Sequence, residues 1–141
     1  MPLETQSVLL KMRWSNGKVT KKRDELIWVG HLRPTEFSPE YTVQLRYRLW
    51  GRPRVAVLDP QLDPGHRSRL PHVYSEDDLC LYTSGDWNST MPLATTIVPW
   101  TAEWLFHYEA WRATDVWSGG GDAYAPKEPP AEPAHESGVA R

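Results

Sequence analysis

The stretch that decides the fold is Tyr41-Thr42-Val43-Gln44-Leu45-Arg46-Tyr47-Arg48-Leu49-Trp50, in which apolar and polar residues alternate. The odd-numbered positions are aromatic or aliphatic, and the even-numbered positions up to residue 48 are polar or charged. Successive side chains of a strand point to opposite faces of a sheet. The alternation therefore predicts a β-strand with one buried face and one partly wet face.

The segments on either side of residues 41–50 fit neighbouring strands. Residues 26–32 are rich in β-branched and aromatic side chains, and Pro34 follows them. On the other side, Gly51-Arg52-Pro53 makes a turn and residues 54–58 return as the next strand. Residues 18–24 are polar and fit an edge strand, where lysines discourage unwanted pairing. Closely spaced strands joined by short turns predict an antiparallel four-stranded meander.

Helical patterns lie at the two ends of this block of strands. Residues 2–12 carry apolar residues at helical spacing, with Pro2 near the first turn. A second helix is predicted to begin near Leu93 or Pro99 and to stop at residues 117–121, which contain three glycines. Aromatic residues recur along it at helical spacing, at Trp100, Trp104, Tyr108 (or His107) and Trp111. The stripe of Trp100, Trp104 and Trp111 is interpreted as core.

This order of elements predicts an α+β domain over residues 1–121, with a loop that carries the candidate site between the meander and the second helix. Residues 122–141 are dominated by proline, alanine and glutamate and show no apolar period. Such a composition cannot bury enough apolar surface to fold, so a disordered tail is predicted.

The composition of the 141 residues excludes several classes of protein. A net charge of −2 argues against a general nucleic-acid or anionic-membrane binder. No apolar run approaches the roughly 20 residues of a membrane-spanning helix, and residues 1–5 lack the features of a signal peptide. A single cysteine cannot form an internal disulfide. The expectation is a soluble cytoplasmic protein.

The candidate chemistry lies between residues 70 and 117, where Cys80 is the only cysteine of the chain. We interpret Cys80 as a nucleophile presented at the lip of the domain. A lone cysteine flanked by leucines is more often a small core residue, and both interpretations stay open. The acidic residues 76–78 disfavour a thiolate, which argues against a permanently ionised, protease-type cysteine.

His72 lies upstream of Cys80 in the segment Pro71-His72-Val73-Tyr74. Its imidazole could donate a hydrogen bond to a tetrahedral oxyanion, or it could pack against Tyr74 and hold the loop. No cofactor is expected, and five scattered histidines with one cysteine lack the spacing of a zinc site.

Several other polar and aromatic residues have both a functional and a structural interpretation. Tyr82 and Trp87 could shape an acceptor groove or simply pack, and Asp86 or Asn88 could steer an amine or merely solvate a loop. A set of arginines could form a basic patch, although a solvated sheet face explains them better: Arg46, Arg48, Arg52 and Arg54.

The order of these segments carries a resemblance to a known family. The matching features are Gly30 with Leu32 and Pro34, Tyr41-Thr42-Val43, Pro71-His72-Val73-Tyr74, Leu79-Cys80-Leu81-Tyr82, Trp87, Thr96-Ile97-Val98-Pro99-Trp100, Glu103-Trp104-Leu105, Tyr108-Glu109-Ala110-Trp111 and Trp117. This layout resembles ubiquitin-conjugating enzymes and, more closely, the conjugating-enzyme-like protein of bacterial type II CBASS anti-phage operons.

The resemblance implies a ubiquitin-conjugating-enzyme-like fold and a transferase in which Cys80 accepts an activated C-terminal carbonyl as a thioester. In the CBASS relatives the donor is a cGAS-like nucleotidyltransferase, and the reaction primes antiviral signalling. Eukaryotic members carry a His-Pro-Asn motif, and His72 falls close to the position of that asparagine. No adenylation motif is present, so this chain alone would not activate its donor.

Two alternatives of other classes remain open at this point. The chain could be a non-catalytic partner-binding module with the same fold, in which Cys80 is merely packed. It could also be a thiol hydrolase in which His72 or His107 serves Cys80 as a base.

Overall fold

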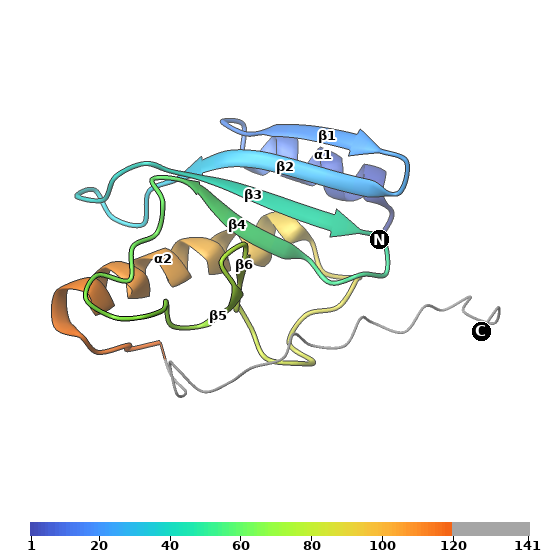
Figure 1. Cartoon of the computed structure of the whole chain (residues 1–141). Helices are drawn as coiled ribbons and strands as arrows, with labels where there is room; N and C mark the ends of the chain where they lie inside the picture. Colours follow the sequence, from blue (N-terminus) through green and yellow to red (C-terminus); the bar gives the residue numbers. More distant parts are fainter. Residues whose placement is uncertain (120–141) are drawn as a thin grey trace.

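A four-stranded antiparallel sheet with helices on one face forms the body of the molecule (Figure 1). The structure is a computed structural model that describes residues 1–119, so the predicted tail 122–141 lies outside the described residues. In chain order the elements are helix α1 (Leu3–Arg13), strands β1 (Lys18–Lys22), β2 (Glu25–Leu32), β3 (Tyr41–Arg48), β4 (Arg54–Asp59), β5 (Val73–Ser75) and β6 (Asp78–Leu79), the 3-10 helix η1 (Leu93–Thr95) and helix α2 (Ile97–Thr114).

The strand order β1-β2-β3-β4 confirms the predicted meander. In the antiparallel register Trp28 pairs with Leu45 and Leu32 pairs with Tyr41, which places the apolar positions of both strands on one face. Along β3 the odd-numbered residues are buried, as the alternation predicted. The strand ends at Arg48 instead of Trp50, because Trp50 adopts a left-handed backbone conformation (φ 69°) in the turn that follows.

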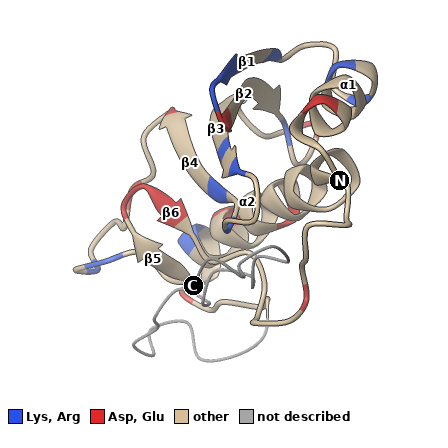
Figure 2. Ribbon diagram, turned by 90° about the vertical axis from the view of Figure 1, so that its right-hand side faces the viewer, with Lys and Arg blue, Asp and Glu red and all other residues tan. Residues whose placement is uncertain are grey.

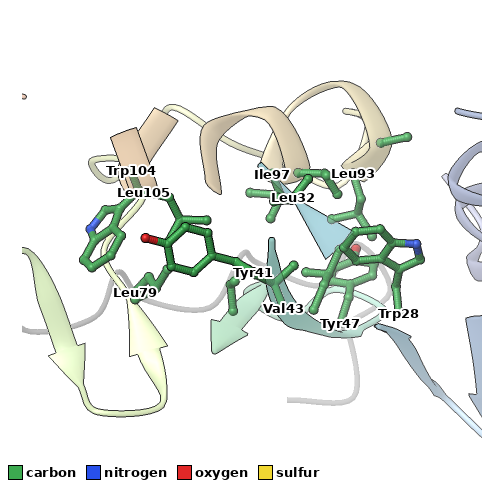
Figure 3. Close-up of a cluster of buried hydrophobic side chains, with 14 of the residues drawn as sticks. Trp28, Leu32, Tyr41, Val43, Tyr47, Leu79, Leu93, Ile97, Trp104 and Leu105 are labelled. Carbon is green, nitrogen blue, oxygen red and sulfur yellow. The ribbon is translucent and has the colours of Figure 1, made fainter. Parts of the chain in front are cut away.

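The core lies between the sheet and the helices (Figure 3). Trp28 and Tyr47 fill it at one end, together with Leu93 and Ile97. At the other end Tyr41, Leu79, Trp104 and Leu105 lie together. Because Leu79 belongs to this cluster, burial of its side chain holds the β5–β6 hairpin, and with it residue 80, against α2.

Helix α1 is tied to the segment before α2 by polar contacts. The fully buried side chain of Gln6 accepts a hydrogen bond from the Leu93 amide (2.8 Å) and donates one to the Met91 carbonyl (3.0 Å). The Trp14 indole donates to the Ala94 carbonyl (2.7 Å). These contacts fix the segment that leads into η1 and α2. The helix predicted to begin near Leu93 or Pro99 is thus two elements, a 3-10 helix from Leu93 and an α-helix from Ile97.

Helix α2 ends at Thr114, where Asp115 adopts a left-handed conformation (φ 69°) and its amide bonds the Trp111 carbonyl (2.8 Å). The chain then turns back, so that Trp117 packs against Trp104 with the ring centroids 5.6 Å apart. Among residues 1–119, no helix is long and apolar enough to cross a membrane.

Candidate functional site

Cys80 directly follows β6, at the end of a small hairpin that the sequence did not predict. Its amide donates a hydrogen bond to the carbonyl of His72 (2.9 Å), which closes the hairpin just outside the β5–β6 ladder. Cys80 is only 7% exposed, yet it lines an open groove on the surface. The sulfur therefore belongs to both the edge of the core and the wall of a cavity.

His72 has a strained backbone, with φ at 46° in the left-handed region. Its carbonyl accepts a second hydrogen bond, from the Trp104 indole (3.0 Å), in addition to the bond from Cys80. Its ring stacks on Trp117, with centroids 4.8 Å apart and planes 22° from parallel. The backbone and the ring of His72 are thus both fixed by the elements that surround Cys80.

The groove beside Cys80 has a volume of about 680 Å³ and is walled mainly by aromatic rings. Among its described lining residues, Glu103 and Asp86 are acidic and none is a lysine or arginine. Aromatic faces and carboxylates both favour a cation over an anion. The lining residues are His72, Cys80, Leu81, Tyr82, Thr83, Asp86, Trp100, Glu103, Trp104, His107, Trp117 and Gly119.

Behind Cys80, a buried ion pair joins the β3–β4 turn to the hairpin. The Arg52 guanidinium donates to both carboxylate oxygens of Asp78, at 3.1 and 2.6 Å. Burial lowers the pKa of Arg52, but the hydrogen bonds and the charge of Asp78 outweigh this effect, so the pKa is raised. The predicted negative field of residues 76–78 on Cys80 is consequently weakened, because the nearest carboxylate has its own counter-ion.

Tyr74 links this ion pair to the cysteine. The Arg52 guanidinium lies over the Tyr74 ring, 5.1 Å from its centroid. Burial, together with a hydrogen bond between the Tyr74 hydroxyl and Cys80, raises the pKa of the phenol. The hydroxyl is therefore protonated at neutral pH and is available as a donor to sulfur.

In the loop after Cys80, the structure places some of the predicted residues in the groove and others in the core or the loop. Tyr82 lines the groove, whereas Trp87 is buried in the core, where its indole donates to Thr96 Oγ1 (3.1 Å). Asp86 lines the groove, but its carboxylate also accepts hydrogen bonds from the Thr83 amide and hydroxyl. Asn88 instead accepts hydrogen bonds from Thr90 and serves the loop itself.

The predicted aromatic stripe of α2 also divides into two groups. Trp104 and Trp111 are buried, which confirms them as core residues, and Tyr108 is buried as well. Trp100 is half-buried and lines the groove, so its assignment to the core was wrong in part. Trp104 is both a core residue and a groove residue, and its indole donates a hydrogen bond to the His72 carbonyl.

The arginines of β3 and β4 do not form an unpaired basic patch. Arg46 donates to Glu25 (3.1 Å) and Arg48 to Asp24 (3.4 Å) on the exposed face of the sheet. Arg52 is buried, and its assignment to a solvated face was wrong. Figure 2 shows basic residues along β1 and also on α1, β3 and β4, and acidic residues at the β5–β6 turn and on other elements.

Sequence reasoning missed Arg52, Tyr74 and Trp117 as parts of the site. Trp117 reaches His72 only because the chain reverses at Asp115, a turn that no residue pattern announced. Within residues 1–119, no group of three or more histidine, cysteine or acidic side chains is arranged to hold a metal ion.

Comparison with known proteins gives one match to a family. The sequence model of a family described as type II CBASS E2 protein (E2-CBASS) matches residues 6–124. None of the curated proteins compared with the chain matches it. The matched range includes most of α1, all of α2, both sheets and every residue of the groove wall.

Proposed function

Because this chain belongs to the type II CBASS E2 family, we propose that it is a transferase that carries an acyl group as a thioester on Cys80. The donor is the C-terminus of a partner protein, and the acceptor is a nucleophile that enters the groove. The observation that carries the proposal is the position of Cys80, which is held by a closed hairpin and lines an open, aromatic-walled groove.

The surroundings of the sulfur suit exchange with an already activated acyl group. The Tyr74 hydroxyl lies at Cys80 as a hydrogen-bond partner, and the charge of Asp78, two residues before the cysteine, is neutralised by Arg52. A thiol in such a place need not be permanently ionised, because the activated donor already supplies a good leaving group.

His72 is proposed to position the reacting carbonyl. Its backbone carbonyl fixes the Cys80 amide, and His72 lines the groove together with Cys80. An imidazole N–H aimed at the tetrahedral oxygen would stabilise the charge that develops there. The stack on Trp117 supports this role, since it holds the ring in one orientation.

The family points to a partner within the same defence system, and we propose a cGAS-like nucleotidyltransferase as the donor. The donor must arrive activated, because the sequence of this chain carries no adenylation motif. Thioester formation then joins the donor's terminal carbonyl carbon to Sγ of Cys80 and releases the activating group.

Incubation of the chain with the neighbouring nucleotidyltransferase and its activating component tests the proposal. A covalent adduct that thiols release, that Cys80→Ala abolishes and that Cys80→Ser converts into a thiol-resistant ester supports the transferase. A complex that is non-covalent and unchanged in Cys80→Ala would identify a binding module instead. Turnover of simple esters without any adduct to the partner would identify a thiol hydrolase.

A further inference from the structure

His107 lies on α2 and lines the same groove as Cys80. Its side chain is only 18% exposed. The ring packs between two aromatic side chains, at 5.4 Å from the Phe106 centroid and 5.7 Å from the Trp117 centroid. The groove therefore contains a second imidazole, and the proposed thioester chemistry assigns it no task.

The two nitrogens of this ring have different neighbours. Nδ1 lies 3.0 Å from the hydroxyl of Ser118, which is hydrogen-bonding distance. Nε2 lies 3.8 Å from Oε1 of Glu103, one helical turn earlier, and Glu103 is itself part of the groove wall. If Nδ1 carries the proton, it donates to Ser118, and Nε2 then has a lone pair that can accept a proton from a molecule in the groove.

General-base catalysis requires a base near the acceptor and a group that orients the base. In this groove His107 would be the base, and Ser118 would orient it. The other carboxylate of the groove, Asp86, is engaged by the Thr83 amide and hydroxyl. Glu103 is itself 69% exposed to solvent. Its charge is nevertheless close enough to stabilise an imidazolium.

We infer that His107 is the general base that deprotonates the acceptor, and that the acceptor is a primary amine which enters the groove past Trp100 and Glu103. The inference rests on the proposed thioester at Cys80. The absence of lysine and arginine from the described groove wall, together with its aromatic rings and two carboxylates, favours such a cationic acceptor.

The step is a transfer of the acyl group from sulfur to nitrogen. The acceptor ammonium passes one proton to Nε2 of His107, and the lone pair of the resulting neutral amine attacks the thioester carbonyl to form the C–N bond. Collapse of the tetrahedral intermediate breaks the C–S bond and leaves its electron pair on Sγ of Cys80. The attacking nitrogen gives its second proton to the thiolate, and the imidazolium releases the first to water, so that an amide, the free thiol and one released proton remain.

Single-turnover discharge of the loaded protein tests the role of His107. The full chain is charged at Cys80 with a fluorescent glycine-terminated peptide supplied as a small-molecule thioester, which bypasses the natural donor. The peptide is then discharged with L-lysine, whose amine is protonated at neutral pH (pKa about 10.4), or with hydroxylamine, whose amine is already neutral. His107→Gln should slow discharge to lysine by about 10²-fold and leave discharge to hydroxylamine unchanged.

Two further variants sharpen the experiment. Glu103→Gln, on the exposed rim, should slow lysine discharge several-fold, because only the stabilisation of the imidazolium is lost. His31→Gln is the matched control, since His31 lies on β2, outside the groove wall. It should discharge as the unmodified protein does.

The outcomes separate the two proposals. If His107→Gln loads normally and discharges to lysine at the parent rate, the role of His107 is overturned. The proposed thioester at Cys80 would still stand. Equal slowing of lysine and hydroxylamine would also overturn the role of His107, because it would show a loss of access or of fold. Failure of the unmodified protein to load at Cys80 would refute the proposed function itself, and the inference would fall with it.

Discussion

The backbone carbonyl of His72 accepts a hydrogen bond from the backbone amide of Cys80 at 2.9 Å. This bond closes the β5–β6 hairpin, whose two strands are short. It therefore helps to hold Cys80 at the groove. The Trp104 indole bonds the same carbonyl, so the buried core of α2 and the candidate nucleophile share one anchor. The position of Cys80 is thereby coupled to the packing of the whole domain.

Trp104→Ala should lower the free energy of unfolding by about 3–5 kcal/mol, because it leaves a cavity in the core and removes the donor to His72. Trp104→Phe keeps part of the bulk and should cost clearly less. Urea denaturation followed by circular dichroism measures both values. An unfolding midpoint of Trp104→Ala equal to that of the parent protein would show that the ring is not a core residue.

Removal of one partner of the buried Arg52–Asp78 ion pair should lower the free energy of unfolding more than removal of both. Arg52→Met alone leaves the Asp78 carboxylate buried without its counter-ion and should cost about 3–5 kcal/mol of unfolding free energy. The double variant Arg52→Met with Asp78→Leu should recover most of that loss. The double-mutant cycle is read from urea unfolding, and additive losses would argue against a strongly coupled pair.

His72 should tolerate replacement only by residues that accept a left-handed backbone and can donate a hydrogen bond. His72→Asn satisfies both conditions and should retain most thioester formation. His72→Val satisfies neither and should slow loading by about 10²–10³-fold, the usual loss for one oxyanion donor. Single-turnover loading of the peptide thioester measures the rates. Equal rates for the two variants would remove His72 from the chemistry.

Two tyrosines, the buried Tyr41 and the half-buried Tyr74, predict how stability depends on alkaline pH. Burial and a hydrogen bond to Glu109 raise the pKa of Tyr41, and burial and a hydrogen bond to Cys80 raise that of Tyr74. Above about pH 10 the unfolded chain loses these protons while the folded chain keeps them. Unfolding free energy should therefore be independent of these groups below pH 10 and fall as the pH rises above it.

Tyr41→Phe tests this pH dependence, because it removes one of the two titrating groups and retains the ring. The slope of unfolding free energy against pH above 10 should become shallower in this variant than in the parent protein. Urea unfolding at a series of alkaline pH values gives both slopes. Identical slopes would mean that Tyr41 ionises alike in the folded and unfolded states.

The sheet could be predicted from the sequence because each of its strands carries its own signal. The alternation along residues 41–48 and the short turns around it are local features, and the structure confirms them. The helix ends were less predictable. The start of α2 depends on contacts with Gln6 and Trp14, which lie about eighty residues away in the chain.

The groove could be predicted only in part, for a similar reason. Cys80, His72 and Tyr82 could be found because they belong to a recognisable segment. Arg52 and Trp117 could not, because their roles depend on contacts that the fold creates between distant segments. The left-handed turn at Asp115 decides where Trp117 lies, and an aspartate in that position carries no distinctive pattern.

The most direct test of the central claim is to locate the covalent bond. Intact-mass spectrometry of the reaction with the activated nucleotidyltransferase should show a species equal to both chains less one water. Peptide mapping at mildly acidic pH should place the donor's terminal residue on Cys80, with release by hydroxylamine. A linkage at any other residue, or no covalent species while Cys80 remains free to alkylate, would contradict the account.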